Sequence, residues 1–172
     1  NGAGGATFAC ADGSGALATL ELPRLDALRN DLLRLAGRYD RVVLDLGAGV
    51  DAAVRHLAEL AGTLVVVATD EPTALTDAYA FIKLTVAEHR HPDIRVAINM
   101  AATAREGERT YGKLLKACEG FLRLSPKLAG VVRRDERVRD CIRHQTSLLT
   151  RSPTTEAAVD VEAMVKRLVA PP

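Results

Sequence analysis

Thr63-Leu-Val-Val-Val-Ala-Thr69 is a continuous apolar run in the middle of the chain. A run of this kind, without alternating polar residues, predicts a β-strand that other elements cover on both faces. Pro72 follows where the first position of a helix is expected, and that helix is predicted to continue to about His89. Ile94–Asn99 is the next predicted strand. A strand, a helix and a second strand in this order predict a parallel pair joined by a right-handed crossover.

The same alternation continues on both sides of this unit. Apolar residues at helical spacing and capping residues predict further helices, and short apolar runs predict further strands. The predicted helices span Pro23 to about Arg38, Asp51–Ala61, Arg105–Leu122, about Arg137–Gln145, and a last helix with Ser152 as N-cap that ends near Val169. The predicted strands are Arg41–Leu46, Leu128–Val132 and a weaker candidate at Thr7–Ala11. This order predicts a single α/β domain over residues 1–172, with a mostly parallel sheet and helices on both faces.

Composition limits the classes of protein that this chain can represent. With 172 residues the chain is long enough for one core, and a formal net charge of +1 gives no argument for a nucleic-acid or anionic-membrane partner. No run of about 18 uncharged apolar residues occurs, so we expect no membrane-spanning segment. The 3 cysteines are widely spaced and form no Cys-x-x-Cys motif, which predicts reduced, structural thiols and a cytosolic protein.

A second informative stretch is Asp40-Arg-Val-Val-Leu-Asp45-Leu-Gly-Ala-Gly49, where a strand pattern ends in an aspartate and runs into a glycine-rich turn. Sheets hold phosphates, metal ions and cofactor riboses at such strand ends. No lysine precedes Lys83, so the sequence contains no Walker A loop upstream of this turn. The stretch therefore has the character of one half of a nucleotide site.

Three interpretations of this stretch stay open from the residues alone. The first is motif I of S-adenosylmethionine-dependent methyltransferases, with Asp70 holding the ribose, although Asp51 stands where the usual third glycine would be. The second is a phosphate-sensing switch, in which Asp45 acts on a metal-bound or attacking water and a glycine lets a backbone N–H approach the terminal phosphate. The third is a structural turn from strand to helix, with Asp51 as the N-cap.

The segments that follow resemble one family at several places. Val65-Val-Val-Ala-Thr69-Asp-Glu71-Pro72-Thr-Ala-Leu-Thr-Asp77-Ala-Tyr79-Ala-Phe-Ile-Lys83 resembles the MinD/ParA-like deviant Walker ATPases, and within them it is most similar to the flagellar-number regulators (FlhG/FleN). Ile98-Asn99-Met100, Gly130–Gln145 and Ser147–Val161 resemble later segments of the same family in the same order. The resemblance covers about residues 37–169. It implies a P-loop NTPase architecture of the SIMIBI (MinD-like) type.

The resemblance implies roles for several residues. Asp45 and Gly49 match the aspartate and the glycine of the family's Asp-x-x-Ala-Gly switch motif. Asp45 would act in catalysis by orienting the attacking water or the water shell of Mg²⁺, and Gly49 would lie near the γ-phosphate. Asn99 would bind adenine, because its amide both donates and accepts hydrogen bonds. The backbone around Arg134 and Asp135 would close the base pocket, and the implied cofactors are ATP or ADP with Mg²⁺.

The function that the resemblance implies is regulation of flagellar number or placement by an ATPase that dimerises with ATP and releases its partners after hydrolysis. The implied partners are a second copy of the chain and a flagellar transcription activator, the companion GTPase of flagellar placement, or basal-body proteins. No direct contact with nucleic acid is expected. The implied location is the cytoplasm, with polar placement and peripheral membrane contact left open.

Two departures from the family pattern change these expectations. Arg133 replaces the usual proline of the base loop, which relaxes the φ angle that proline would hold. The family's first strand, its lysine-containing phosphate loop and its first switch aspartate have no counterpart, so the fold is expected to be N-terminally incomplete. Without those groups the triphosphate loses most of its charge stabilisation, and we expect weak or absent nucleotide binding and no hydrolysis. A nucleotide-independent partner-binding module derived from this fold is therefore the alternative function, and a methyltransferase is a third.

Overall fold

The computed structural model describes residues 20–47, 50–88 and 93–169. The chain divides into two compact units, Asn1–Leu60 and Ala61–Pro172, and each is described by itself. The prediction of one domain over the whole chain stays a prediction. The weaker strand candidate at Thr7–Ala11 and the switch residue Gly49 lie outside the described residues.

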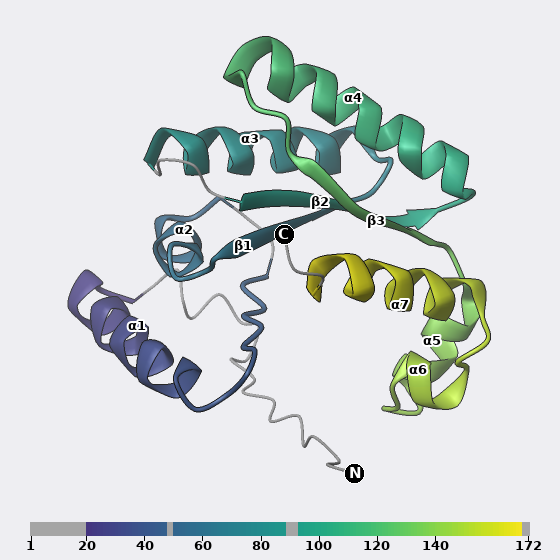
Figure 1. The fold of residues 1–172 in the computed structure, drawn as a ribbon, viewed down its shortest axis with the longest axis horizontal. Coiled ribbons are helices and arrows are strands. Elements are labelled where there is room, and N and C mark those ends of the chain that lie inside the picture. Colours follow the sequence, from purple (N-terminus) through teal and green to yellow (C-terminus); the bar gives the residue numbers. More distant parts are fainter. Residues whose placement is uncertain (1–19, 48–49, 89–92, 170–172) are drawn as a thin grey trace. The chain divides into compact units, whose positions relative to one another are not determined.

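Two helices make up the regular structure that is described in the first unit (Figure 1). They are α1 (Leu22–Ala36) and α2 (Ala52–Ala58). Leu25 of α1 and Leu57 of α2 are buried. Arg29 of α1 forms an ion pair of 2.8 Å with Glu59, directly after α2. Both helices lie where the sequence predicts them, although α2 ends three residues before the predicted Ala61.

The predicted strand at Arg41–Leu46 is wrong, because these residues form no strand in the described structure. Val43 is 90% exposed, whereas a core strand would bury it. An apolar pattern specifies an extended backbone, but a strand also needs a neighbour to exchange hydrogen bonds with. The three strands of the described sheet all belong to the second unit.

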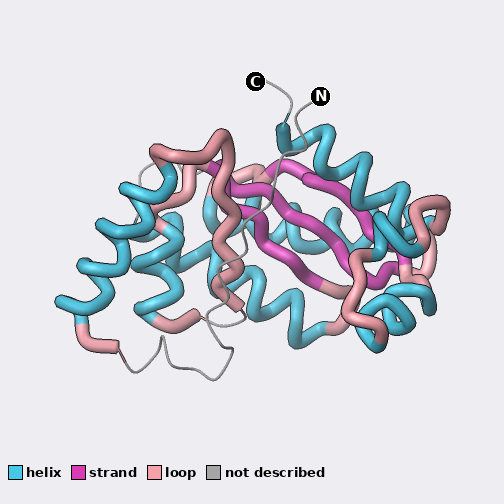
Figure 2. Tube along the Cα trace, turned by 90° about the horizontal axis from the view of Figure 1, so that it is seen from below, coloured by secondary structure: helices cyan, strands magenta, loops and turns pink. Residues whose placement is uncertain are grey.

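The second unit alternates strands and helices, as predicted. Its elements are β1 (Thr63–Ala68), α3 (Pro72–Glu88), β2 (Asp93–Ala101), α4 (Ala104–Leu122), β3 (Lys127–Arg133), α5 (Glu136–Arg143), α6 (Leu148–Arg151) and α7 (Glu156–Val169). The strands form a parallel sheet in the order β1-β2-β3. Figure 2 shows the sheet in magenta, with the helices in cyan. Each crossover between neighbouring strands contains one helix, which is the connection that parallel pairing requires.

Helices cover both faces of this sheet (Figure 1). Gly107 of α4 lies against Val131 of β3, and Met164 of α7 lies against the preceding residue, Gly130. Successive residues of a strand point to opposite faces, so α4 and α7 pack on opposite sides. The helix α3 packs beside α4 and against β1. The three-layer arrangement confirms the predicted α/β class.

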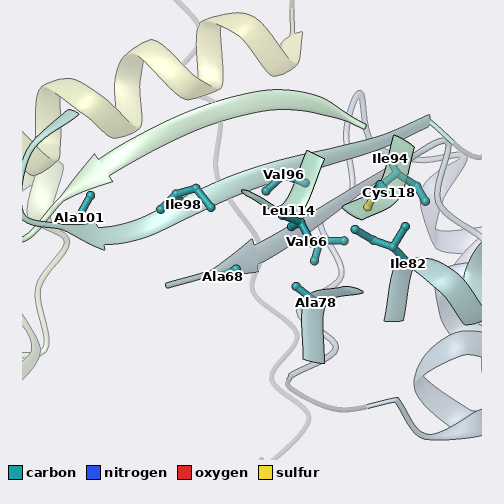
Figure 3. Packing of buried hydrophobic residues seen from close by; sticks show 10 residues of the cluster. All are labelled: Val66, Ala68, Ala78, Ile82, Ile94, Val96, Ile98, Ala101, Leu114 and Cys118. Carbon is teal, nitrogen blue, oxygen red and sulfur yellow. The ribbon is translucent and has the colours of Figure 1, made fainter. Parts of the chain in front are cut away.

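The core of the unit lies between the sheet and the pair α3–α4 (Figure 3). Aliphatic side chains of β1 and β2 meet those of the two helices there, and Cys118 of α4 is fully buried among them. The buried members are Val66, Ala68, Ala78, Ile82, Ile94, Val96, Ile98, Ala101, Leu114 and Cys118. Burial raises the pKa of the Cys118 thiol, which fits the predicted structural, reduced cysteine.

One face of β1 departs from the prediction of cover on both sides. Val66 and Ala68 are buried towards the helices, but Val65 and Val67, which alternate with them, are 40% and 62% exposed. Within the described sheet, β1 also pairs with β2 on one side only. The strand therefore has a free edge and an uncovered apolar face among the described residues.

The last helix begins later than the sequence predicts. Ser152 was expected as the N-cap of α7, but the helix begins at Glu156. Thr155 takes the capping role instead, because its Oγ1 accepts a hydrogen bond from the backbone N–H of Ala158 at 3.4 Å. The short helix α6 occupies Leu148–Arg151 and is absent from the sequence prediction. Its last residue, Arg151, is held by an ion pair of 2.9 Å to Asp140 of α5.

Candidate functional site

The parallel sheet places the ends of its strands at one edge, where parallel α/β proteins bind ligands. At this edge β1 runs into Thr69–Glu71, β2 ends at Ala101 and β3 ends at Arg133. The sequence analysis assigns site roles to Asn99, near the end of β2, and to Arg134 and Asp135, directly after β3. These three residues lie at neighbouring strand ends.

The end of β2 has an irregular backbone at Asn99 and Met100. Ile98 pairs with Val131 and Ala101 with Arg133, so two residues of β2 face one residue of β3, as in a β-bulge. Met100 has a left-handed φ of 57°, a conformation that costs free energy for a residue with a side chain. Such backbone conformations concentrate at functional sites. The bulge leaves both Asn99 and Met100 exposed.

The Asn99 side chain is partly committed to this bulge. Its Oδ1 accepts a hydrogen bond from the backbone N–H of Met100 at 2.9 Å. The Asn99 amide nitrogen donates no hydrogen bond within the described part of the chain, so both of its N–H groups are available to a ligand, together with the second lone pair of Oδ1. An amide that donates and accepts side by side can pair with the N6 and N7 edge of adenine.

The loop after β3 is tied directly to the end of β2. The backbone N–H of Arg134 donates to the carbonyl oxygen of Ala101 at 2.8 Å. Asp135 is the N-cap of α5, where its Oδ1 accepts from the backbone N–H of Arg137 at 2.9 Å. The Asp135 carboxylate is thus used in capping, and the backbone of this loop is what lies beside the bulge of Asn99.

Asp45 belongs to the first unit and is exposed. Its Oδ1 accepts a hydrogen bond from the backbone N–H of Gly47 at 3.3 Å, and Gly47 has a left-handed φ of 72° that glycine adopts without strain. Among the described residues the second carboxylate oxygen accepts no hydrogen bond, so Asp45 can serve a Mg²⁺ ion through a bridging water. Mg²⁺ takes one or two carboxylates and completes its shell with water and phosphate oxygens, and the described residues contain no cluster of three or more metal-ligating side chains.

Arg133, the residue that replaces the family's proline, is held by α7. Its backbone N–H and Nε both donate to Asp160 Oδ2, at 3.0 Å and 2.8 Å, and its Nη2 donates to Oδ1 at 3.0 Å. Burial alone would raise the pKa of the Asp160 carboxyl, but the hydrogen bonds and charge of Arg133 outweigh it and hold the pKa below its ordinary value. Glu156 adds a second ion pair to the same guanidinium.

Sequence reasoning missed Asp160 and Glu156. The signal that could have found them is the spacing of the two acids, four residues apart and therefore on one face of α7. An acidic pair facing a strand that ends in arginine indicates an ion-pair cluster. What the pattern does not supply is which of the neighbouring arginines the acids bind.

Comparison with solved structures defines the class of protein. The chain matches the MinD cell division protein of Aquifex aeolicus with a TM-score of 0.66 at 16% identity, covering 89% of this chain and 63% of that one. It matches a ParA family ATPase of Chlorobium tepidum with a TM-score of 0.63 at 19% identity, covering 85% of this chain and 57% of that one. The chain therefore has the MinD/ParA-type P-loop NTPase fold, as the sequence predicts.

Sequence relatives narrow the class further. The antiactivator FleN of Pseudomonas aeruginosa is 32% identical over 134 residues, which cover 78% of this chain and 48% of FleN. The flagellum site-determining protein YlxH of Helicobacter pylori is 35% identical over 80 residues, or 46% of this chain and 26% of YlxH. The resemblance to MinD/ParA-like ATPases, and among them to flagellar-number regulators of the FlhG/FleN type, is confirmed. No protein-family model matches the chain.

The chain spans about half the length of FleN and a smaller share of YlxH. In the part of the chain that the structure describes, no helix combines the length and the apolar character needed to cross a membrane.

Proposed function

We propose that this chain forms part of a MinD-like ATPase that regulates flagellar number or placement. The observation that carries the proposal is the strand-end geometry of the second unit. Asn99 presents free amide N–H groups on a bulge, and the Arg134 N–H to Ala101 bond brings the loop after β3 beside it. This geometry suits the edge of an adenine base, and similarity to FleN and YlxH supplies the flagellar context.

In this proposal Asn99 reads the base, while the backbone around Arg134 and Asp135 borders the base pocket. By the resemblance, Asp45 would orient the water shell of Mg²⁺ or the attacking water, and Gly49 would be the switch glycine for the terminal phosphate. In the whole ATPase, ATP then favours a dimer of two copies, because a ligand that binds between two copies stabilises the associated state. That dimer binds a partner such as a flagellar transcription activator, the flagellar-placement GTPase or a basal-body protein in the cytoplasm, with polar placement and peripheral membrane contact left open.

The test is a titration of the chain with ADP. The NMR chemical shifts of backbone amides near Asn99 and Arg134 monitor binding. The variant Asn99→Ala should weaken ADP binding by about two- to tenfold, the equivalent of one or two neutral hydrogen bonds. Asn30→Ala, which removes an exposed amide from α1, is the matched control and should leave the affinity unchanged.

Binding of ADP that is unaffected by Asn99→Ala would contradict the proposed base site. Absence of any ADP-dependent shift up to millimolar concentration would favour the alternative function, a partner-binding module that works without nucleotide.

A further inference from the structure

The end of β3 is joined to the last helix by a cluster of charge-assisted hydrogen bonds. Three N–H groups of Arg133, one from the backbone and two from the guanidinium, converge on the carboxylate of Asp160 in α7. The side chains are 25% exposed at Arg133 and 16% exposed at Asp160. Bidentate arginine–carboxylate contacts of this kind are strong and geometrically specific. The position of β3's last residue is therefore set by α7.

Close packing of α7 on β3 brings the carboxylate within reach. A Cβ built on Gly130 would lie 2.9 Å from the Cβ of Met164, so only glycine allows α7 to approach the strand this closely. The approach puts Asp160, one helical turn before Met164, beside the end of the strand.

The next residue, Arg134, connects this cluster to the candidate site. The Arg134 N–H donates to Ala101 at the end of β2, two residues beyond Asn99. Two sets of hydrogen bonds, Arg133 to Asp160 and Arg134 to Ala101, are thus joined by the peptide bond between Arg133 and Arg134, and the second ends two residues from Asn99. Arg133 keeps the backbone N–H that a proline would lack. The hydrogen bond from this N–H to Asp160 can therefore hold the loop, where a proline would hold it by a fixed φ.

We propose that Asp160 is a positioning residue of the candidate nucleotide site, and that α7 controls the geometry of the base loop through it. This inference rests on the proposed function. Asp160 does not touch the base; it holds Arg133, so that the loop of Arg134 and Asp135 stays beside Asn99. A shift of α7 relative to β3 is then expected to change the affinity for nucleotide.

The test compares Asp160→Ala and Asp160→Asn with two matched controls on the same helix. Glu156→Gln removes the exposed ion pair between Glu156 and Arg133 but leaves the hydrogen bond from the Arg133 backbone N–H to Asp160. Glu162→Gln changes an exposed acid on the same helix. Amide hydrogen exchange at Arg134 reports the loop directly. We expect both Asp160 variants to accelerate exchange at Arg134 by about tenfold or more beyond any acceleration at Val96, which lies in the core of β2 and reports only the change in global stability.

The second readout is the ratio of ADP to GDP affinity. Loss of positioning should weaken ADP binding by about tenfold and bring the two affinities closer together, whereas a lower folded fraction would weaken both equally. Asp160→Glu, which keeps the charge, should restore part of the ratio. Both control variants should remain within about twofold of the wild type.

The outcomes separate the two proposals. If the wild type binds ADP in preference to GDP and Asp160→Asn changes neither the ratio nor the exchange at Arg134, the positioning role is wrong and the proposed function stands. If the wild type binds neither nucleotide, the proposed function fails, and the role of Asp160 in it fails as well. If Asp160→Ala does not fold, the Asp160→Asn results decide.

Discussion

Gly107 of α4 packs directly against Val131 of β3. A Cβ built on Gly107 would lie within 3.0 Å of both γ-methyl groups of Val131. It would also lie 3.1 Å from the Cβ of Ala101. The contact closes α4 onto the sheet next to the strand ends that form the candidate site. Gly107 and Ala101 are both buried, so a methyl group at position 107 would have no solvent to turn into.

Substitution Gly107→Ala is expected to destabilise the protein by about 1–3 kcal/mol, since overpacking forces the helix away from the sheet. Gly112→Ala in the same helix is the control, because a Cβ there meets nothing within 4 Å. That variant should stabilise by about 0.5–1 kcal/mol through helix propensity. Urea denaturation of the two variants checks both signs, and an unchanged midpoint for Gly107→Ala would contradict the packing argument.

The free energy of unfolding is expected to fall in acid as the Asp160 carboxylate becomes protonated. Its pKa is lower in the folded chain than the ordinary value of about 3.9, so its contribution is complete above that value and is lost as the pH falls through the folded pKa. Asp160→Asn should lower the free energy of unfolding by about 1–3 kcal/mol at pH 7 and reduce the steepness of the decline below about pH 4. Denaturation series at several pH values measure this, with exposed Asp77→Asn as the control. Parallel pH curves for wild type and Asp160→Asn would rule the linkage out.

Mg-ATP is expected to bind this 172-residue chain only weakly. Asn99 offers base contacts, but the sequence has no lysine-containing phosphate loop before Lys83. Isothermal titration calorimetry should show no Kd tighter than about 100 μM, which corresponds to roughly 5.5 kcal/mol. A submicromolar Kd would mean that other residues form a complete phosphate site.

Association of this chain is expected to be independent of nucleotide. The described edge of β1 is unpaired on one side, and Val65 and Val67 leave an apolar face uncovered. Such an edge favours pairing with another chain. Light scattering at several protein concentrations, with and without Mg-ATP, should give the same oligomer distribution in both conditions. A transition from monomer to dimer on adding Mg-ATP would refute this expectation and indicate a complete switch.

S-adenosylmethionine is expected not to bind. If Asp45 and Asp70 held this cofactor, it would raise the melting temperature by mass action. No shift should be seen up to about millimolar cofactor, far above the Kd range of a functional site. A shift that Asp70→Ala abolishes would restore the methyltransferase interpretation.

Local pattern was sufficient for the strands and long helices of the second unit. The run from Thr63 and the run from Ile94 form β1 and β2 with ends within two residues of the prediction, and α3 begins at Pro72 as expected. Apolar runs bounded by turn residues and a proline at a helix start act within a few residues, so they can be recognised without knowing the tertiary structure. The roles of Asn99, Arg134 and Asp135 came from the family resemblance instead, and they stay predictions.

Ser152 as a helix cap failed locally, but the wrong strand and the missed acid both involve partners distant in the sequence. Arg41–Leu46 has the composition of a strand, but a strand requires a neighbouring backbone, and no local pattern names one. The bond that ties Arg133 to Asp160 joins residues 27 positions apart. Residue order alone was enough for the α/β class and the parallel topology, because these depend on local periodicity and on strand order. Tertiary packing alone decided which strands pair and which acid holds the base loop, because those contacts exist only once distant segments are brought together.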